Sequence, residues 1–135
     1  LDLVGMPLHS LSAIMLPKVE TKEQVEAFSN ALTKLSSATP PPIAALLETP
    51  LGVLATAQIA SHSSLCALGF GAEDYSGAIG VHPNALALTW PAQQVITGLF
   101  LLIFDTLAAK RSKGMFLEDF KCPLLYSEGV RTSII

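Results

Sequence analysis

The stretch IAALLETPLG, residues 43–52, decides the fold, because an apolar run stops there abruptly at a carboxylate, Glu48. A second stretch, LCALGFGAEDY at residues 65–75, repeats the arrangement, with Asp74 soon after the apolar run. A continuous apolar run is typical of a parallel strand that is buried on both faces. Barrel enzymes place their chemistry at the carboxyl ends of such strands. Two carboxylates at the ends of separate strands therefore predict a site for a hard cation.

The composition indicates a single folded domain. The chain has 135 residues, of which 50% are hydrophobic and 14% charged, so it is too apolar to be disordered. The net charge of −3 implies no general attraction to nucleic acid. Cys66 and Cys122 make neither a disulfide framework nor a zinc set, and Cys66 lies in a strand-like run. We expect a reduced core thiol there, which fits the cytoplasm or an organelle matrix.

No segment of the chain predicts targeting or membrane insertion. The first residues lack both the basic region and the apolar core of a signal peptide. The longest apolar stretch, residues 95–104, is shorter than the roughly 20 residues that a membrane-spanning helix needs. We expect it to be the end of a buried helix followed by a buried strand.

Apolar runs and helical patterns alternate along the chain. The predicted strands are residues 12–19, 43–47, 65–70, 101–104 and 129–135; the predicted helices are residues 21–35, 51–60, 91–98 and 116–126; residues 77–89 read as irregular. Thr21 and Gln24 form a capping-box pair at the start of the first helix. Strand starts recur at the spacing of a βα unit, which predicts an α/β fold with a parallel sheet.

Two architectures fit five βα units: an open doubly wound sheet, or part of a (β/α)8 barrel, which typically has about 250 residues. The first would commonly carry a glycine-rich phosphate loop. Neither G-x-G-x-x-G nor the P-loop pattern occurs, and residues 69–71 (GFG) lack the third glycine. This favours the partial barrel and argues against nucleotide binding through those motifs.

Three motifs in order resemble a known family. Residues 14–20 (IMLPKVE), 47–53 (LETPLGV) and 71–75 (GAEDY) are similar to strand ends of the citrate lyase beta-subunit family, within the HpcH/HpaI aldolase/citrate lyase superfamily of barrel lyases. Residues 104–106 (FDT) look like its next strand. The resemblance implies a partial TIM (β/α)8 barrel, roughly strands four to eight. Residues 1–135 would then form one incomplete barrel domain, without the first three strands and the family's N-terminal arginine.

The resemblance also implies a reaction. In the family, the residues at the positions of Glu48 and Asp74 hold Mg²⁺. The expected activity is a carbon–carbon lyase that cleaves a citryl-CoA or malyl-CoA-like thioester through a metal-stabilised enolate. A divalent ion acts there as a Lewis acid.

Further residues are expected to contact the substrate. The backbone of Gly71, Ala72 and Glu73 could bind a substrate carboxylate, because glycine allows close approach and successive amides form an anion-binding nest. We expect Glu48 to contact the substrate as well, and Lys18 could reach a phosphate or carboxylate. Solvation is an alternative for Lys18. For Glu73 a structural role is the alternative, since adjacent side chains in extended chain point apart.

Other interpretations remain open at this stage. A 2-oxo-acid aldolase of the same superfamily would act on free acids. A non-catalytic barrel fragment or subunit would need a partner chain, because an open remnant leaves sheet edges and apolar faces exposed. We expect a homo-oligomer, an acyl-CoA or 2-oxo-acid substrate, and neither nucleic acid nor membrane as a partner.

Overall fold

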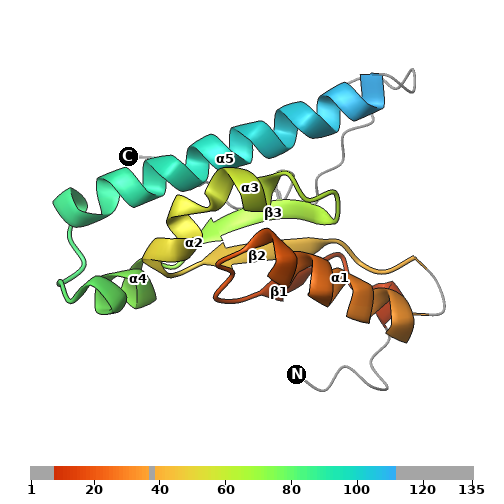
Figure 1. Ribbon diagram of the computed structural model, residues 1–135, viewed down its shortest axis with the longest axis horizontal. Helices are drawn as coiled ribbons and strands as arrows, with labels where there is room; N and C mark the ends of the chain where they lie inside the picture. The colour runs from red at the N-terminus through yellow and green to blue at the C-terminus, as the bar shows by residue number, and fades with distance from the viewer. Residues whose placement is uncertain (1–7, 37–38, 112–135) are drawn as a thin grey trace.

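The computed structural model describes residues 8–36 and 39–111 (Figure 1); for His9 and residues 105–111 it describes the backbone alone. The elements in order are a short 3₁₀ helix η1 (Leu8–Ser10), β1 (Ile14–Leu16), α1 (Lys22–Leu35), β2 (Ile43–Leu47), α2 (Pro50–Leu54), α3 (Thr56–Ala60), β3 (Leu65–Phe70), α4 (Ala72–Ile79) and α5 (Ala85–Arg111). The order is that of successive βα units, as the sequence predicts.

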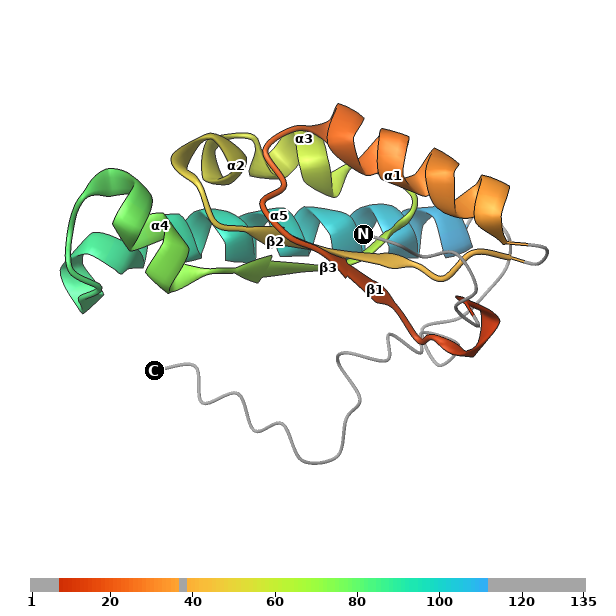
Figure 2. The ribbon, with the colours of Figure 1, turned by 90° about the horizontal axis from the view of Figure 1, so that it is seen from below.

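The three strands form one parallel sheet in the order β1-β2-β3. Ile14 pairs with Ile43, and at the other end of the sheet Leu47 pairs with Phe70. Helices α1, α2 and α3 lie over one face of this sheet, and α5 runs along its β3 side against α3 (Figure 2). Because all strands run the same way, their carboxyl ends meet at one edge.

The central strand shows why the apolar runs fold as predicted. In β2, Ile43, Ala45 and Leu47 are essentially inaccessible to solvent, and Ala44 on the opposite side of the strand is also buried. Both faces of the strand are therefore covered along most of its length, and a continuous apolar run is what such a position requires. Strands β2 and β3 have the predicted bounds, whereas β1 is limited to three residues.

The first helix is confirmed together with its capping box. The Thr21 hydroxyl accepts from the Gln24 N–H at 3.3 Å, and the Gln24 side chain accepts from the Thr21 N–H at 3.2 Å. Val25 and Leu32 are buried and Phe28 is half-buried, as their helical spacing predicts. Leu35, in the last turn, is exposed. The apolar stripe thus fixes the helix on the sheet along most of its length.

The predicted helix over residues 51–60 is two short helices, α2 and α3, which meet at Ala55. The first begins one residue earlier than predicted, because Pro50 occupies its first turn and the Thr49 hydroxyl accepts from the Gly52 N–H at 3.2 Å. Gly52 lies against the backbone after β1: a Cβ built on it would overlap the Val19 carbonyl oxygen.

The predictions beyond residue 76 are wrong in two places. Residues 77–79 complete α4, and residues 85–89 open α5, so only a short part of the stretch predicted as irregular is a loop. Asn84 starts α5, since its side-chain oxygen accepts from the Ala87 N–H at 3.0 Å. Residues 101–104, predicted as a strand, continue α5 without a break, and Asp105 lies within the helix rather than at a strand end.

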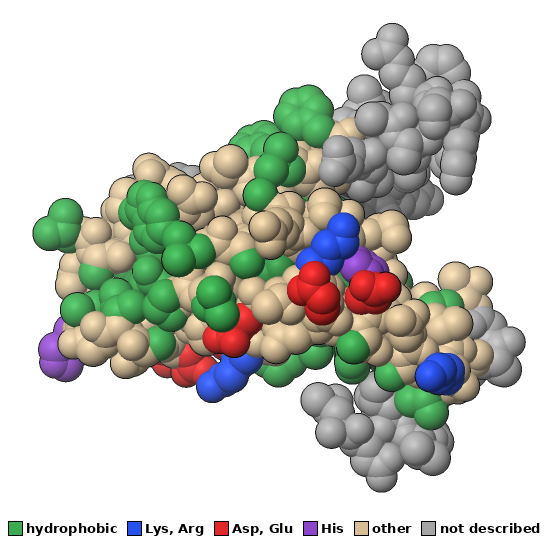
Figure 3. Space-filling view, in the orientation of Figure 1, with side chains coloured by type: hydrophobic (Ala, Val, Ile, Leu, Met, Phe, Trp, Pro, Cys, Tyr) green, Lys and Arg blue, Asp and Glu red, His purple; other side chains and the backbone are tan. Residues whose placement is uncertain are grey.

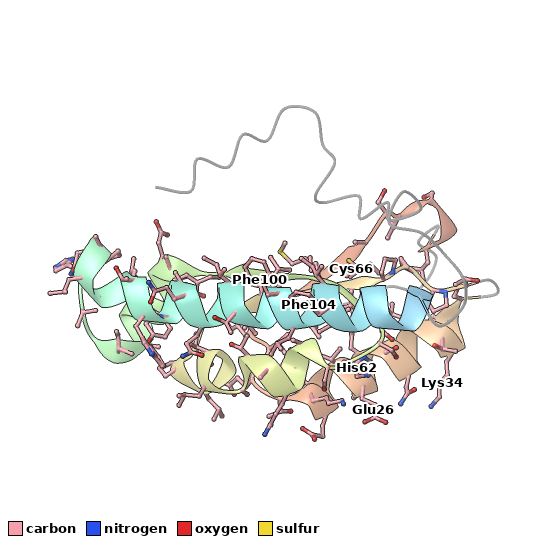
Figure 4. The ribbon with its side chains drawn as sticks, turned by 90° about the horizontal axis from the view of Figure 1, so that it is seen from above. Glu26, Lys34, His62, Cys66, Phe100 and Phe104 are labelled. Carbon is pink, nitrogen blue, oxygen red and sulfur yellow. The ribbon has the colours of Figure 1, made fainter. Side chains whose placement is uncertain are left out.

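Helix α5 is apolar on both sides. Pro91, Val95 and Leu102 are buried against the rest of the protein. On the opposite side, Leu86 (91% exposed) and Phe104 (65% exposed) face solvent, together with Trp90, Phe100 and Leu101. Figure 3 shows hydrophobic side chains gathered over this helix, and Figure 4 labels Phe100 and Phe104 along it. A helix that is hydrophobic all round has a second surface to cover.

The span Ala85–Phe104 is also long and apolar enough to cross a membrane, by length and composition. The apolar segment is therefore longer than the stretch of residues 95–104 that was expected from the sequence. A single helix of this kind is weak evidence for a membrane, because the core helix of a soluble protein meets the same test. The side of α5 that faces away from its exposed residues packs against α3 and β3, so the helix is part of the packed α/β fold.

Near its middle, α5 packs unusually closely against α3. A Cβ built on Gly98 would overlap the Thr56 methyl group of α3. Thr56 is itself buried, and its hydroxyl donates to the Val53 carbonyl oxygen at 2.6 Å. The two helices therefore approach at a point where only a glycine fits. The predicted helix over residues 116–126, the predicted strand over residues 129–135 and Cys122 lie outside the described residues.

We expect Gly52→Ala to destabilise the fold by at least about 2 kcal/mol, because the added methyl overlaps a backbone carbonyl. The matched control is Gly77→Ala in α4, where an added Cβ has nothing within 4 Å. There the better helix propensity of alanine should stabilise by about 0.5–1 kcal/mol. Urea unfolding followed by circular dichroism measures both. Equal stability of Gly52→Ala and the parent would contradict the close approach.

Candidate functional site

The candidate site lies at the edge of the sheet where the three parallel strands end. One segment is the turn after β1, which contains Lys18; the second is Glu48, directly after β2; the third is the start of α4, which follows β3. Two backbone bonds hold these segments together. The Val19 N–H donates to the Leu46 carbonyl at 3.1 Å, and the Gly71 N–H donates to the Leu47 carbonyl at 2.9 Å.

Lys18 connects the two predicted metal-binding carboxylates. Its backbone N–H donates to Glu48 Oε2 at 3.1 Å. Its side-chain Nζ lies 3.3 Å from Asp74 Oδ2. The Lys18 and Asp74 side chains are 68% and 53% exposed, so this ion pair lies at an open surface. Figure 3 shows acidic and basic side chains side by side at the corresponding edge, between α4 and the turn after β1.

Lys18 reaches both carboxylates because its backbone is left-handed, with φ of 53°. A side chain other than that of glycine, asparagine or aspartate rarely adopts this conformation, which costs roughly 1–2 kcal/mol. The surrounding structure compensates, since the Val19 N–H and the Lys18 N–H both point to acceptors on β2 or at its end. Sequence reasoning placed Lys18 near the site but missed this turn, because lysine carries no signal for a left-handed residue.

Gly71 gives the Glu48 carboxylate its space. A Cβ built on Gly71 would lie 2.6 Å from Glu48 Cγ and 2.8 Å from Glu48 Oε1. Any larger residue would push the carboxylate out of its position. The Gly71 N–H is already bonded to the Leu47 carbonyl, so this amide is not available to a substrate. That corrects the expectation that Gly71 contributes its own amide to an anion nest.

Ala72, Glu73 and Asp74 form the first turn of α4. The first N–H groups of a helix have no acceptor within the helix, and no side chain caps this one among the described residues. Glu73 was expected in extended chain, but it is an exposed helical residue next to Asp74. Tyr75, in the same turn, is buried and packs edge-to-face on Phe70 with ring centroids 5.3 Å apart. This contact anchors the start of α4 to the end of β3.

The donor set fits a hard divalent cation. Mg²⁺ is usually bound by one or two carboxylates, with water and substrate oxygens completing the octahedron. Each carboxylate uses one oxygen for Lys18, through Glu48 Oε2 and Asp74 Oδ2, so Glu48 Oε1 and Asp74 Oδ1 remain for a cation. Among the described residues there is no cluster of three or more His, Cys, Asp or Glu side chains that could hold a metal. A site of two carboxylates is therefore the arrangement to consider.

Comparison with known proteins bears on the same residues. The family model for HpcH/HpaI aldolase/citrate lyase matches residues 5–94, which is well over half of the chain and includes all three strand ends. The chain belongs to this family. It is a family of lyases and aldolases, in agreement with the resemblance of the three motifs.

Solved structures show the same fold. RipC from Yersinia pestis matches with a TM-score of 0.60 and 22% identity, over 69% of this chain and 42% of that one. The citrate lyase beta subunit from M. tuberculosis, complexed with oxaloacetate and magnesium, matches with a TM-score of 0.53 and 23% identity, over 66% and 39%. Citrate synthase SbnG matches with a TM-score of 0.57 and 19% identity, over 78% and 54%.

These matches confirm the partial-barrel prediction. The HpcH/HpaI-family chain spans about two-fifths to about half of the length of the solved structures that it matches. No curated protein matches the chain.

We expect Lys18→Gly to be more stable than Lys18→Ala by about 1 kcal/mol, because glycine adopts φ of 53° without the steric cost that alanine bears. Both variants lose the ammonium group and keep the backbone N–H, so their difference isolates the left-handed turn. Thermal unfolding in the presence of EDTA measures it. If alanine were as stable as glycine, the turn would not be left-handed in solution.

Proposed function

We propose that this chain carries the metal-binding part of the active site of a Mg²⁺-dependent carbon–carbon lyase of the citrate lyase beta-subunit type. The observation that carries the proposal is that Lys18 contacts both Glu48 and Asp74, at the edge where the parallel strands have their carboxyl ends. The substrate would be a citryl-CoA or malyl-CoA-like thioester. A 2-oxo-acid aldolase of the same superfamily is the alternative, and it would use the same two carboxylates.

Glu48 and Asp74 would supply the carboxylate ligands that hold the ion. Cleavage of a carbon–carbon bond next to a carbonyl leaves the bonding electron pair on the product as an enolate. When bound, Mg²⁺ supplies a Lewis acid that lowers the free-energy cost of the charge developing on the carbonyl oxygen. Gly71 keeps the Glu48 carboxylate in place for this task, because no side chain competes for the space.

The first turn of α4 would orient the substrate. Its N–H groups and the positive end of the helix dipole favour an anion, and a substrate carboxylate is the group that this reaction presents. Ala72 and Glu73 would contribute backbone amides, and Lys18 would contribute its ammonium once the substrate arrives. Oxaloacetate and magnesium bound to the M. tuberculosis citrate lyase beta subunit support this assignment of ligand chemistry.

We expect the parent chain to bind Mg²⁺ more tightly in the presence of oxaloacetate, because the 2-oxo acid adds oxygen ligands to the ion. Glu48→Gln and Asp74→Asn should each weaken the affinity at least tenfold, since each removes a charged ligand. The matched control is Glu26→Gln on α1, an exposed acid that lies at the other end of the molecule from α4 (Figure 4). Isothermal titration calorimetry measures all four proteins.

Two outcomes would contradict this assignment. Binding that survives in both site variants would place the ion elsewhere. A parent chain that folds cooperatively but binds no Mg²⁺ would mean that these residues do not assemble the site by themselves.

We also propose that the protein acts as a homo-oligomer. The exposed side of α5 supports this, because Leu86, Trp90, Phe100 and Phe104 are large apolar side chains exposed on one helix, and no Asp, Glu, Lys or Arg lies between residues 75 and 104. A cytoplasmic or organelle-matrix location, which is also a proposal, is consistent with a reduced Cys66 thiol in β3.

Light scattering after size-exclusion chromatography is expected to give a mass above the 14.3 kDa of one chain. Phe100→Ser combined with Phe104→Ser should lower that mass, because the two rings are 57% and 65% exposed on α5. Leu54→Ser on α2, where the side chain is 71% exposed, serves as the control and should leave the mass unchanged. A monomeric parent chain would refute the oligomer.

A further inference from the structure

We propose that Lys18 is a positioning residue that holds both carboxylates ready in the metal-free protein and competes with the incoming cation for Asp74. The inference rests on the proposed function and adds to it a regulation of metal binding. It is carried by one juxtaposition: two different groups of the same residue touch the two carboxylates of the site.

The backbone group acts on Glu48. The Lys18 N–H donates to Glu48 Oε2, and the left-handed φ of 53° aims the N–H across to the end of β2. Gly71 packs against the other side of the same carboxylate. Glu48 is thus fixed from two directions by groups that are present whether or not a cation is bound. This contact should persist in the metal-bound state, because it uses Oε2 and leaves Oε1 free.

The ammonium group acts on Asp74. Two carboxylates at one strand-end edge repel each other in the absence of a counter-ion, and the Lys18 ammonium at 3.3 Å from Asp74 Oδ2 supplies that counter-charge. A divalent cation brought to the same carboxylates makes the ammonium redundant and repels it. Because Lys18 is 68% exposed, its side chain is free to leave for solvent or for a substrate carboxylate.

The ammonium therefore raises the concentration of Mg²⁺ at which the site fills, and it returns to Asp74 when the ion departs. A residue that only supported the fold would leave metal affinity unaffected by its charge. The metal affinity of charge variants is consequently the discriminating readout, with no need for catalytic turnover.

The test compares Lys18→Met, which removes the charge and keeps the backbone N–H, with Lys18→Arg, which keeps both. We expect Lys18→Met to bind Mg²⁺ about three- to tenfold more tightly than the parent, the range that a partly screened ion pair next to a divalent charge allows. The Mg²⁺ affinity of Lys18→Arg should stay within about twofold of that of the parent, because arginine keeps the positive charge and an exposed ion pair contributes little energy. The matched control is Lys34→Met on α1, an exposed lysine far from the site (Figure 4), which removes the same charge.

Calorimetry in matched low-salt buffer measures these affinities. Affinity of Lys18→Met that is equal to or weaker than that of the parent would overturn the proposal. Equal tightening by Lys34→Met would also overturn it, because net charge alone would then explain the effect.

A second measurement needs no metal. A double-mutant cycle of Lys18→Met and Asp74→Asn, by thermal unfolding in EDTA, should give a coupling that favours the native pair. Zero coupling would overturn the ion pair even if Mg²⁺ binds, and the proposed lyase site would stand without it. Positive coupling in a protein that binds no Mg²⁺ would support the ion pair but overturn the competition between Lys18 and a cation, and it would mean that these residues do not assemble the metal site by themselves.

Discussion

The fold depends on the packing of the turn after β1 against the junction of β2 and α2. There the Val19 N–H bonds to the Leu46 carbonyl, and the Val19 carbonyl oxygen fills the space that a side chain at position 52 would need. Thr49 starts α2 at the same point through its bond to the Gly52 N–H. Main-chain atoms contact each other here, so the backbone of this junction sets the position of Glu48 relative to Lys18.

Sequence reasoning succeeded where local signals and tertiary structure agree. The run of residues 43–47 is apolar because β2 is buried on both faces, and its end at Glu48 marks the edge of the sheet. The pair Thr21 and Gln24 predicted the start of α1, and the structure contains both bonds of the capping box. The strand-end carboxylates could be located in the same way, since a parallel sheet brings its carboxyl ends together.

The same reasoning failed where the sequence signal is ambiguous. An apolar run of a few residues fits a buried strand or a buried helix equally well, and residues 101–104 belong to the helix. Pro91 was interpreted as the first turn of a helix, yet α5 begins at Ala85, where Asn84 caps it. The contact of Lys18 with both carboxylates could not be predicted either, because it depends on a left-handed lysine that only the assembled turn imposes.

The contact between Gly98 and Thr56 has a consequence for how α5 is seated. An amphipathic helix is oriented by its apolar stripe, but α5 carries large apolar side chains on its exposed side as well as on its buried side, so its apolar pattern defines its position along the sheet only weakly. Gly98 acts as a notch into which the Thr56 methyl group fits. A shift by a turn would bring the larger side chains of Gln94 or Leu102 to the notch, where they do not fit. The absence of a side chain at Gly98 thus favours one axial register of α5, where the apolar pattern of the helix gives little direction.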